Sequence, residues 1–112
     1  MSWREIATPG RDGTILRGDL HVAPGDQRRP GLLIRTPYGR QQYHDDSMVA
    51  KAVERGYAVV VQDVRGRFDS AGAFDPYKHE GHDGYDTIEW IATQPWSNGR
   101  VATAGLSPWT WR

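Results

Sequence analysis

The sequence contains no cysteine. This absence excludes disulfide bridges, thiolate catalysis and zinc sites built on cysteine. Neither a G-x-G-x-x-G loop nor a Walker-type loop occurs, so the usual glycine motifs that bind dinucleotides and nucleotide phosphates are missing. We therefore expect no cofactor.

An excess of charge is also missing. Lys and Arg total 14, Asp and Glu total 14, and the net charge is zero with neutral histidine. Proteins that bind nucleic acid or anionic membranes usually carry a basic excess, so neither partner is expected. The longest apolar run, around residues 58–61, is far too short to cross a bilayer, and the first residues lack the apolar core of a signal peptide. These features predict a soluble, cytoplasmic protein and leave its oligomeric state open.

The 112 residues are enough for one domain, which we predict to begin with a hairpin. Strands at 3–8 and 14–22 flank a turn rich in Pro, Asp and Gly. A short apolar strand follows at 32–34. The strongest strand, at 57–61, is apolar on both faces, as is typical of a parallel strand covered by helices on each side.

A first helix is predicted between these two strands, with Ser47 as its N-cap, residue 55 near its end and Gly56 at the C′ position. Its apolar stripe is formed by Met48, Val49, Ala52 and Val53.

A second helix is predicted to start at His82 or Asp83 and to stop before Pro95. Its apolar face is formed by Tyr85, Ile88 and Ile91. A last short strand follows at 101–104. The alternation predicts an α/β fold, in which an N-terminal hairpin precedes strand–helix–strand–helix–strand with a mainly parallel sheet. Chemistry is then expected in the loops at the carboxyl ends of the strands.

The last of these loops begins with Gly105-Leu106-Ser107, the first half of a G-x-S-x-G nucleophile elbow. In that motif a tight strand-to-helix turn exposes the serine hydroxyl. The tripeptide alone is common, and an ordinary turn serine is the alternative.

The stretches before Ser107 form an ordered set. They are RTPYG at 35–39, GYAVVVQDVRG at 56–66, SAGAF at 70–74, DGYDTIEWI at 83–91, QPWSNG at 94–99 and VATAGLS at 101–107. In order and spacing, this set resembles the amino-terminal part of the α/β-hydrolases of the X-prolyl dipeptidyl peptidase and cocaine esterase (CocE/NonD) family.

The resemblance implies an acyl-enzyme hydrolase that acts on small esters or X-Pro peptides. Ser107 stands where the family keeps its nucleophile. Tyr38 stands where the family places a tyrosine hydroxyl in the oxyanion hole, and a donor aimed at the developing oxyanion is worth about 3 kcal/mol. The alternative for Tyr38 is a loop aromatic packed on the sheet.

Other polar residues are interpreted as structural. Asp63 and Arg65 follow the strongest strand, where an Asp can accept backbone N–H groups or pair with Arg. Gly66 and Gly72 suit loop conformations that a side chain would obstruct. Ser70 lies outside a G-x-S context and is not expected to be a nucleophile.

The sequence marks none of the four histidines as a catalytic base. His79 and His82 are three residues apart beside Asp83, but Gly81 and the nearby helix start make a shared metal-binding face unfavourable. We expect them to cap the helix in solvent. His21 and His44 lie in a strand and a loop, without a mark of catalysis.

The resemblance stops at Ser107. Pro108 has no backbone N–H, the group that normally provides one oxyanion donor, and losing such a donor costs about 100- to 1000-fold in rate. Trp109 or Thr110 occupies the position of the second glycine.

The family's triad Asp and His come after the serine, and neither follows within these residues. We therefore expect residues 1–112 to be the amino-terminal part of a hydrolase domain, truncated at the elbow by an early stop, a frameshift or an incomplete gene model. Such a chain is expected to be inactive and poorly soluble, because its last strand forms an exposed sheet edge.

The alternative is a non-catalytic remnant or a small protein-binding domain. It would use the exposed sheet edge and a Trp-rich end, with Trp96, Trp109 and Trp111 as contacts.

Overall fold

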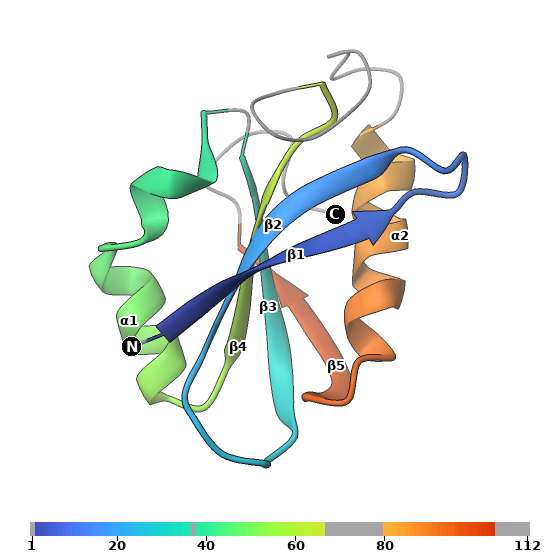
Figure 1. Ribbon diagram of the computed structural model, residues 1–112. Helices are drawn as coiled ribbons and strands as arrows, with labels where there is room; N and C mark the ends of the chain where they lie inside the picture. Colours follow the sequence, from blue (N-terminus) through green and yellow to red (C-terminus); the bar gives the residue numbers. More distant parts are fainter. Residues whose placement is uncertain (1, 37, 67–79, 105–112) are drawn as a thin grey trace.

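The strands form one mixed sheet in the computed structural model, which describes residues 2–36, 38–66 and 80–104 (Figure 1). The order across this five-stranded sheet is β1-β2-β4-β3-β5. The strand bounds are β1 Ser2–Pro9, β2 Ile15–Val22, β3 Arg29–Thr36, β4 Ala58–Asp63 and β5 Ser97–Thr103.

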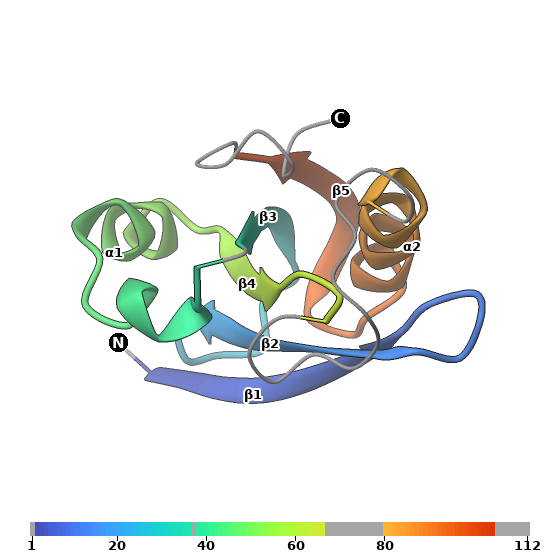
Figure 2. The ribbon, with the colours of Figure 1, turned by 90° about the horizontal axis from the view of Figure 1, so that it is seen from above.

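Helices cover the sheet from two sides. They are the 3-10 helix η1 at Arg40–Tyr43, α1 at Ser47–Glu54 and α2 at Glu80–Ala92. Seen from above, η1 and α1 lie on one side of β4 and β3, and α2 lies on the other (Figure 2). Among the described residues, no helix has the length and apolar character needed to span a membrane.

The strand directions confirm the predicted α/β arrangement. β1 pairs antiparallel with β2, from Ser2 opposite Val22 to Pro9 opposite Ile15. β2 runs antiparallel to β4, whereas β3 is parallel to both β4 and β5. The hairpin therefore extends a parallel core of three strands.

β4 carries the core on both of its faces because its side chains alternate. Val59 and Val61 pack with α1 and η1, whereas Ala58 and Val60 pack with α2. All six residues of β4 are buried, as predicted for a parallel strand between helices. On the α2 side, β3 approaches the helix so closely that a Cβ at Gly31 would lie 2.7 Å from Ile91 Cγ2.

The start of α1 differs from the prediction. The N-cap is Asp46 rather than Ser47, because the Asp46 carboxylate accepts hydrogen bonds from the N–H groups of Met48 and Val49 at 2.8 and 3.1 Å. Met48 is exposed instead of lying on the apolar stripe. At the other end, Gly56 has φ 96°, which confirms its C′ role.

The start of α2 also differs, since the helix begins at Glu80 rather than at His82 or Asp83. Tyr85 is exposed and does not belong to the buried face. Ile91 is buried and Ile88 packs against the core, as predicted. The buried face also contains Asp83 and Thr87, because buried polar partners satisfy these two side chains.

Two strands are longer than predicted at their amino ends. β3 begins at Arg29 and β5 at Ser97, and these two residues are paired in register. Because β5 comes last in the strand order, it forms a sheet edge within the described part of the chain, as predicted.

Candidate active site

The loops after β3 and β4 leave the sheet side by side. The two strands are parallel, with Thr36 opposite Asp63, and the Val64 N–H donates to the Thr36 carbonyl at 3.1 Å. The Ala104 N–H donates to the Leu33 carbonyl at 3.0 Å, so the chain leaving β5 runs toward the same edge. The described parts of the loops after β3 and β4 therefore lie at the carboxyl edge of the sheet, and β5 ends at the same edge.

Tyr38 lies in the loop after β3, between the strand and η1. Its backbone N–H donates to Thr36 Oγ1 at 2.9 Å, and its side chain is 61% exposed. The alternative that Tyr38 packs on the sheet is therefore wrong. Ser107 lies outside the described residues, as do Ser70, Gly72 and His79.

Arg40 lies at the centre of a buried charge cluster beneath this loop. Its guanidinium contacts Asp63 Oδ2 at 2.5 Å, Asp19 Oδ1 at 3.0 Å and Glu5 Oε2 at 2.6 Å. Its backbone N–H also donates to Asp63 Oδ1 at 2.9 Å. We call Arg40, Asp19, Asp63 and Glu5 the Arg40 cluster.

The Arg40 cluster keeps its cation charged despite burial. Burial alone would lower the pKa of the Arg40 guanidinium, but hydrogen bonds and charges from Asp19 and Asp63 outweigh it and raise the pKa above its ordinary value. Asp63 thus accepts a backbone N–H and pairs with an arginine, as predicted, and the partner is Arg40.

Arg65 instead fastens the loop after β4 to two other elements. It donates to both carboxylate oxygens of Asp83 in α2 at 2.8 Å, and to Asp12 in the hairpin turn at 3.0 Å. The Asp83 hydrogen bond raises the pKa of Arg65, and the Arg65 hydrogen bond lowers the pKa of Asp12. Gly66 then turns with φ 73°, in agreement with its predicted loop role.

A second polar network lies inside the sheet–α2 layer, around Gln62 of β4. Its Oε1 accepts from Arg35 Nε at 2.7 Å, and its Nε2 donates to Thr8 Oγ1 at 2.7 Å and Thr87 Oγ1 at 3.0 Å. All four side chains are buried. This network fixes α2 against the sheet.

His44 has a carboxylate partner that the sequence did not indicate. Its Nε2 lies 2.6 Å from Asp19 Oδ2, and its ring stacks on Trp3 with centroids 3.9 Å apart. Asp19 is already paired with Arg40, and no hydroxyl group of the described residues bonds to His44. The pair therefore belongs to the Arg40 cluster rather than to a catalytic dyad.

The other described histidines are His21 and His82. His21 is fully buried, and neither of its ring nitrogens has a hydrogen-bond partner in the described part of the chain. Burial lowers the pKa of His21. His82 is exposed on α2, and no group of three or more His, Asp or Glu side chains could hold a metal within residues 2–36, 38–66 and 80–104.

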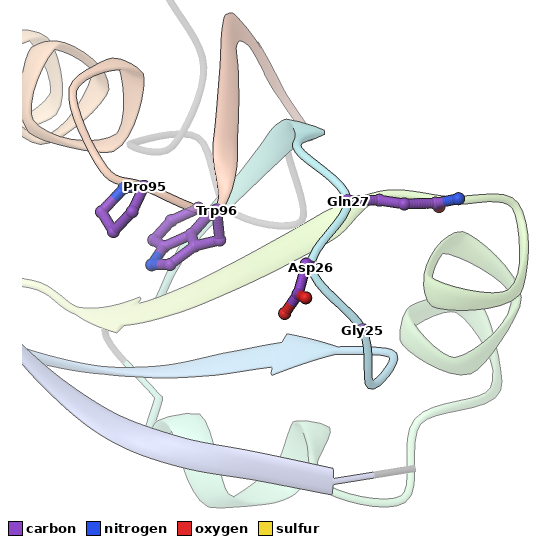
Figure 3. A pocket seen from close by; sticks show the side chains of 5 residues that line it. All are labelled: Gly25, Asp26, Gln27, Pro95 and Trp96. Atoms are coloured by element: carbon purple, nitrogen blue, oxygen red, sulfur yellow. The ribbon is translucent and has the colours of Figure 1, made fainter.

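A shallow hollow of about 260 Å³ lies at the opposite end of the sheet, where β3 and β5 begin. It is lined by Gly25, Asp26, Gln27, Pro95 and Trp96, and the Gln27 side chain points away from Trp96 (Figure 3). Trp96 also packs on Trp90 and the core and is partly buried. The hollow is separate from the loops at the carboxyl edge.

Comparison with known protein families identifies a family to which this sequence is similar. Residues 12–109 match the family described as X-Pro dipeptidyl-peptidase (S15 family). The chain belongs to the S15 family. This finding confirms the resemblance inferred from the ordered stretches between residues 35 and 107.

Relatives of this S15 chain are considerably longer. Cocaine esterase of Rhodococcus sp. is 39% identical over 106 residues, which cover 91% of the chain and 18% of that protein. The S15 chain thus spans about a fifth of the length of this relative.

Solved structures agree on the α/β-hydrolase fold. An aminopeptidase from a marine sediment Thaumarchaeota archaeon superposes with a TM-score of 0.80 at 31% identity, covering 93% of the S15 chain and 21% of its own. A CocE/NonD family hydrolase from Staphylococcus aureus superposes with a TM-score of 0.82 at 26% identity, covering 92% and 22%.

Proposed function

We propose that this chain contributes two groups to the active site of a serine hydrolase: Ser107 as nucleophile and Tyr38 as oxyanion donor. The observation that carries the proposal is the placement of Tyr38. Its phenol is exposed at the carboxyl edge of the sheet, and β5 runs toward that edge just before Ser107. Membership of the S15 family supports the same roles.

The proposed reaction is acyl transfer. The Ser107 hydroxyl attacks the substrate carbonyl carbon and gives its proton to a histidine, and the carbonyl oxygen becomes an oxyanion that accepts the Tyr38 hydrogen bond. The bond to the leaving group then breaks, and the leaving group takes the proton. Water releases the acyl group in the second half of the reaction.

The proposed substrates are small acyl esters or X-Pro peptides, because both kinds of bond pass through the same tetrahedral intermediate. The relatives support both classes by name, since one is a cocaine esterase and the family is that of X-Pro dipeptidyl-peptidases. No cofactor takes part in this chemistry.

We further propose that residues 1–112 are inactive by themselves. A serine hydroxyl needs a base at neutral pH, and the Asp and His of this fold come after the serine, where the printed sequence provides neither. Pro108 removes a further oxyanion donor.

A chimera tests the proposed roles. Residues 1–107 replace the matching first part of Rhodococcus cocaine esterase, whose own sequence follows from there. We expect hydrolysis of p-nitrophenyl acetate, with loss to background in Ser107→Ala. We expect kcat about 100- to 1000-fold lower in Tyr38→Phe, as for other oxyanion donors.

Circular dichroism confirms that each chimera folds. If a folded chimera carrying Ser107→Ala or Tyr38→Phe hydrolyses p-nitrophenyl acetate as fast as the unsubstituted chimera, the substituted residue has another role.

Protein binding is the second candidate function, and one observation favours it. β5 is a sheet edge, and four of its residues, Asn98, Gly99, Arg100 and Ala102, are exposed. Exposed edges pair with other chains. Light scattering of the 112-residue chain tests this candidate, which predicts association that Thr103→Pro disrupts. The Ala104 N–H donates to β3, so the N–H of the adjacent Thr103 points to the open edge, and a proline there leaves the β3–β5 pairing intact.

A further inference from the structure

The segment that carries Tyr38 is fastened on both sides to the ends of two neighbouring strands. On the amino-terminal side, Thr36 Oγ1 of β3 accepts a hydrogen bond from the backbone N–H of Tyr38 itself at 2.9 Å. On the carboxyl-terminal side, Asp63 Oδ1 of β4 accepts a hydrogen bond from the backbone N–H of Arg40 at 2.9 Å. Thr36 is 1% exposed and Asp63 is fully buried.

Both acceptors lie at the ends of paired strands. Thr36 and Asp63 face each other in the register of β3 and β4. The second oxygen of Asp63 is bound by the Arg40 guanidinium, which Asp19 also contacts. Groups built on strand ends and supported in this way are placed more accurately than groups held by a loop alone.

The Tyr38 phenol depends on this support. Its hydroxyl has no hydrogen-bond partner among the described residues, and its side chain extends into solvent. An oxyanion donor must lie about 2.7–3.1 Å from the developing charge. Because a 1 Å misplacement can cost about 100-fold in rate, the backbone of Tyr38 must be fixed by its neighbours.

We infer that Thr36 and Asp63 are positioning residues that fix the Tyr38 phenol for transition-state stabilisation, with Thr36 acting directly on the Tyr38 backbone. This inference rests on the proposed function of Tyr38. It assigns a role to the side-chain oxygen of Thr36 that β-strand formation does not require.

The first test uses the 112-residue chain. Thr36→Val removes the acceptor and keeps the branched shape that suits a strand, and Thr36→Ser restores the acceptor. We expect the Tyr38 amide to exchange about tenfold faster in Thr36→Val, as measured by NMR, and near the wild-type rate in Thr36→Ser. An unchanged rate in Thr36→Val would overturn the inference.

The second test uses the active chimera and a double-mutant cycle. Thr36→Val should lower kcat at least tenfold with little change in KM, and Thr36→Ser should restore it. In the Tyr38→Phe background, Thr36→Val should have little further effect, since the hydroxyl it positions is already gone.

A merely structural Thr36 would lower kcat by the same factor in both backgrounds, and that result would overturn the positioning role. A different result is expected if the proposed function of Tyr38 is wrong. In that case Tyr38→Phe alone leaves kcat unchanged, whereas the amide of Tyr38 still exchanges faster in Thr36→Val.

Discussion

Replacing Arg40 by methionine removes the cation that lies between two buried carboxylates. The Asp19 and Asp63 side chains are each 1% exposed, and that of Arg40 is 8% exposed, so solvent screens the cluster little. Removing one partner of a buried pair costs about 3–5 kcal/mol, because an uncompensated charge stays behind. A domain of 112 residues has a free energy of unfolding of about 5–15 kcal/mol. Arg40→Met should therefore remove at least about a fifth of the stability.

Urea unfolding followed by tryptophan fluorescence measures this loss. With a slope of about 2 kcal/mol/M, the midpoint should fall by roughly 2 M. The triple variant Arg40→Met, Asp19→Asn, Asp63→Asn should recover most of the loss, since no buried charge is then left unpaired and the half-exposed Glu5 carboxylate is solvated.

Arg11→Met is the matched control. Arg11 pairs with Asp86 at 2.9 Å, but its side chain is 52% exposed, and exposed pairs are worth about 0–1 kcal/mol. Equal losses in Arg11→Met and Arg40→Met, or a loss below about 1 kcal/mol in Arg40→Met, would refute the reasoning.

Three further predictions concern stability and rate. Because burial lowers the pKa of His21, the unfolded chain binds a proton near pH 6.5 that the folded chain does not, and stability should fall as the pH drops below about 6.5. His21→Leu should flatten this dependence in thermal melts from pH 5 to 8, and an unchanged slope would contradict the assignment. Asp46→Ala should cost about 0.5–2 kcal/mol in urea unfolding, whereas Ser47→Ala should cost much less; the reverse order would contradict the observed cap. A chimera that retains this chain through residue 109 should have a kcat about 100- to 1000-fold lower than one joined after residue 107, and Pro108→Ala should recover most of it; equal rates would show that Pro108 withholds no oxyanion donor.

The sequence predicts those helices and strands whose buried side chains are apolar. β4 is recognisable because consecutive valines fill both faces of a parallel strand, and the antiparallel hairpin follows from its turn residues. The fold class and the location of Tyr38 at the carboxyl edge follow from these elements and from the resemblance to the S15 family.

The Arg40 cluster could not be predicted from the sequence. Arg40 is 21 residues from Asp19 and 23 from Asp63, and charged residues are usually assigned to the surface. The polar part of the buried face of α2 is unpredictable for the same reason, because Asp83 and Thr87 are buried only through their partners in other elements. Where two capping residues are adjacent, as at Asp46 and Ser47, local propensity does not decide between them.

The most direct test of the central claim is to label the chimera with a fluorophosphonate and to map the modified peptide. We expect the label on Ser107 in the chimera, no label after Ser107→Ala, and no label in the 112-residue chain alone. A folded chimera that is labelled at another residue, or a 112-residue chain that is labelled as fast as the chimera, would contradict the account.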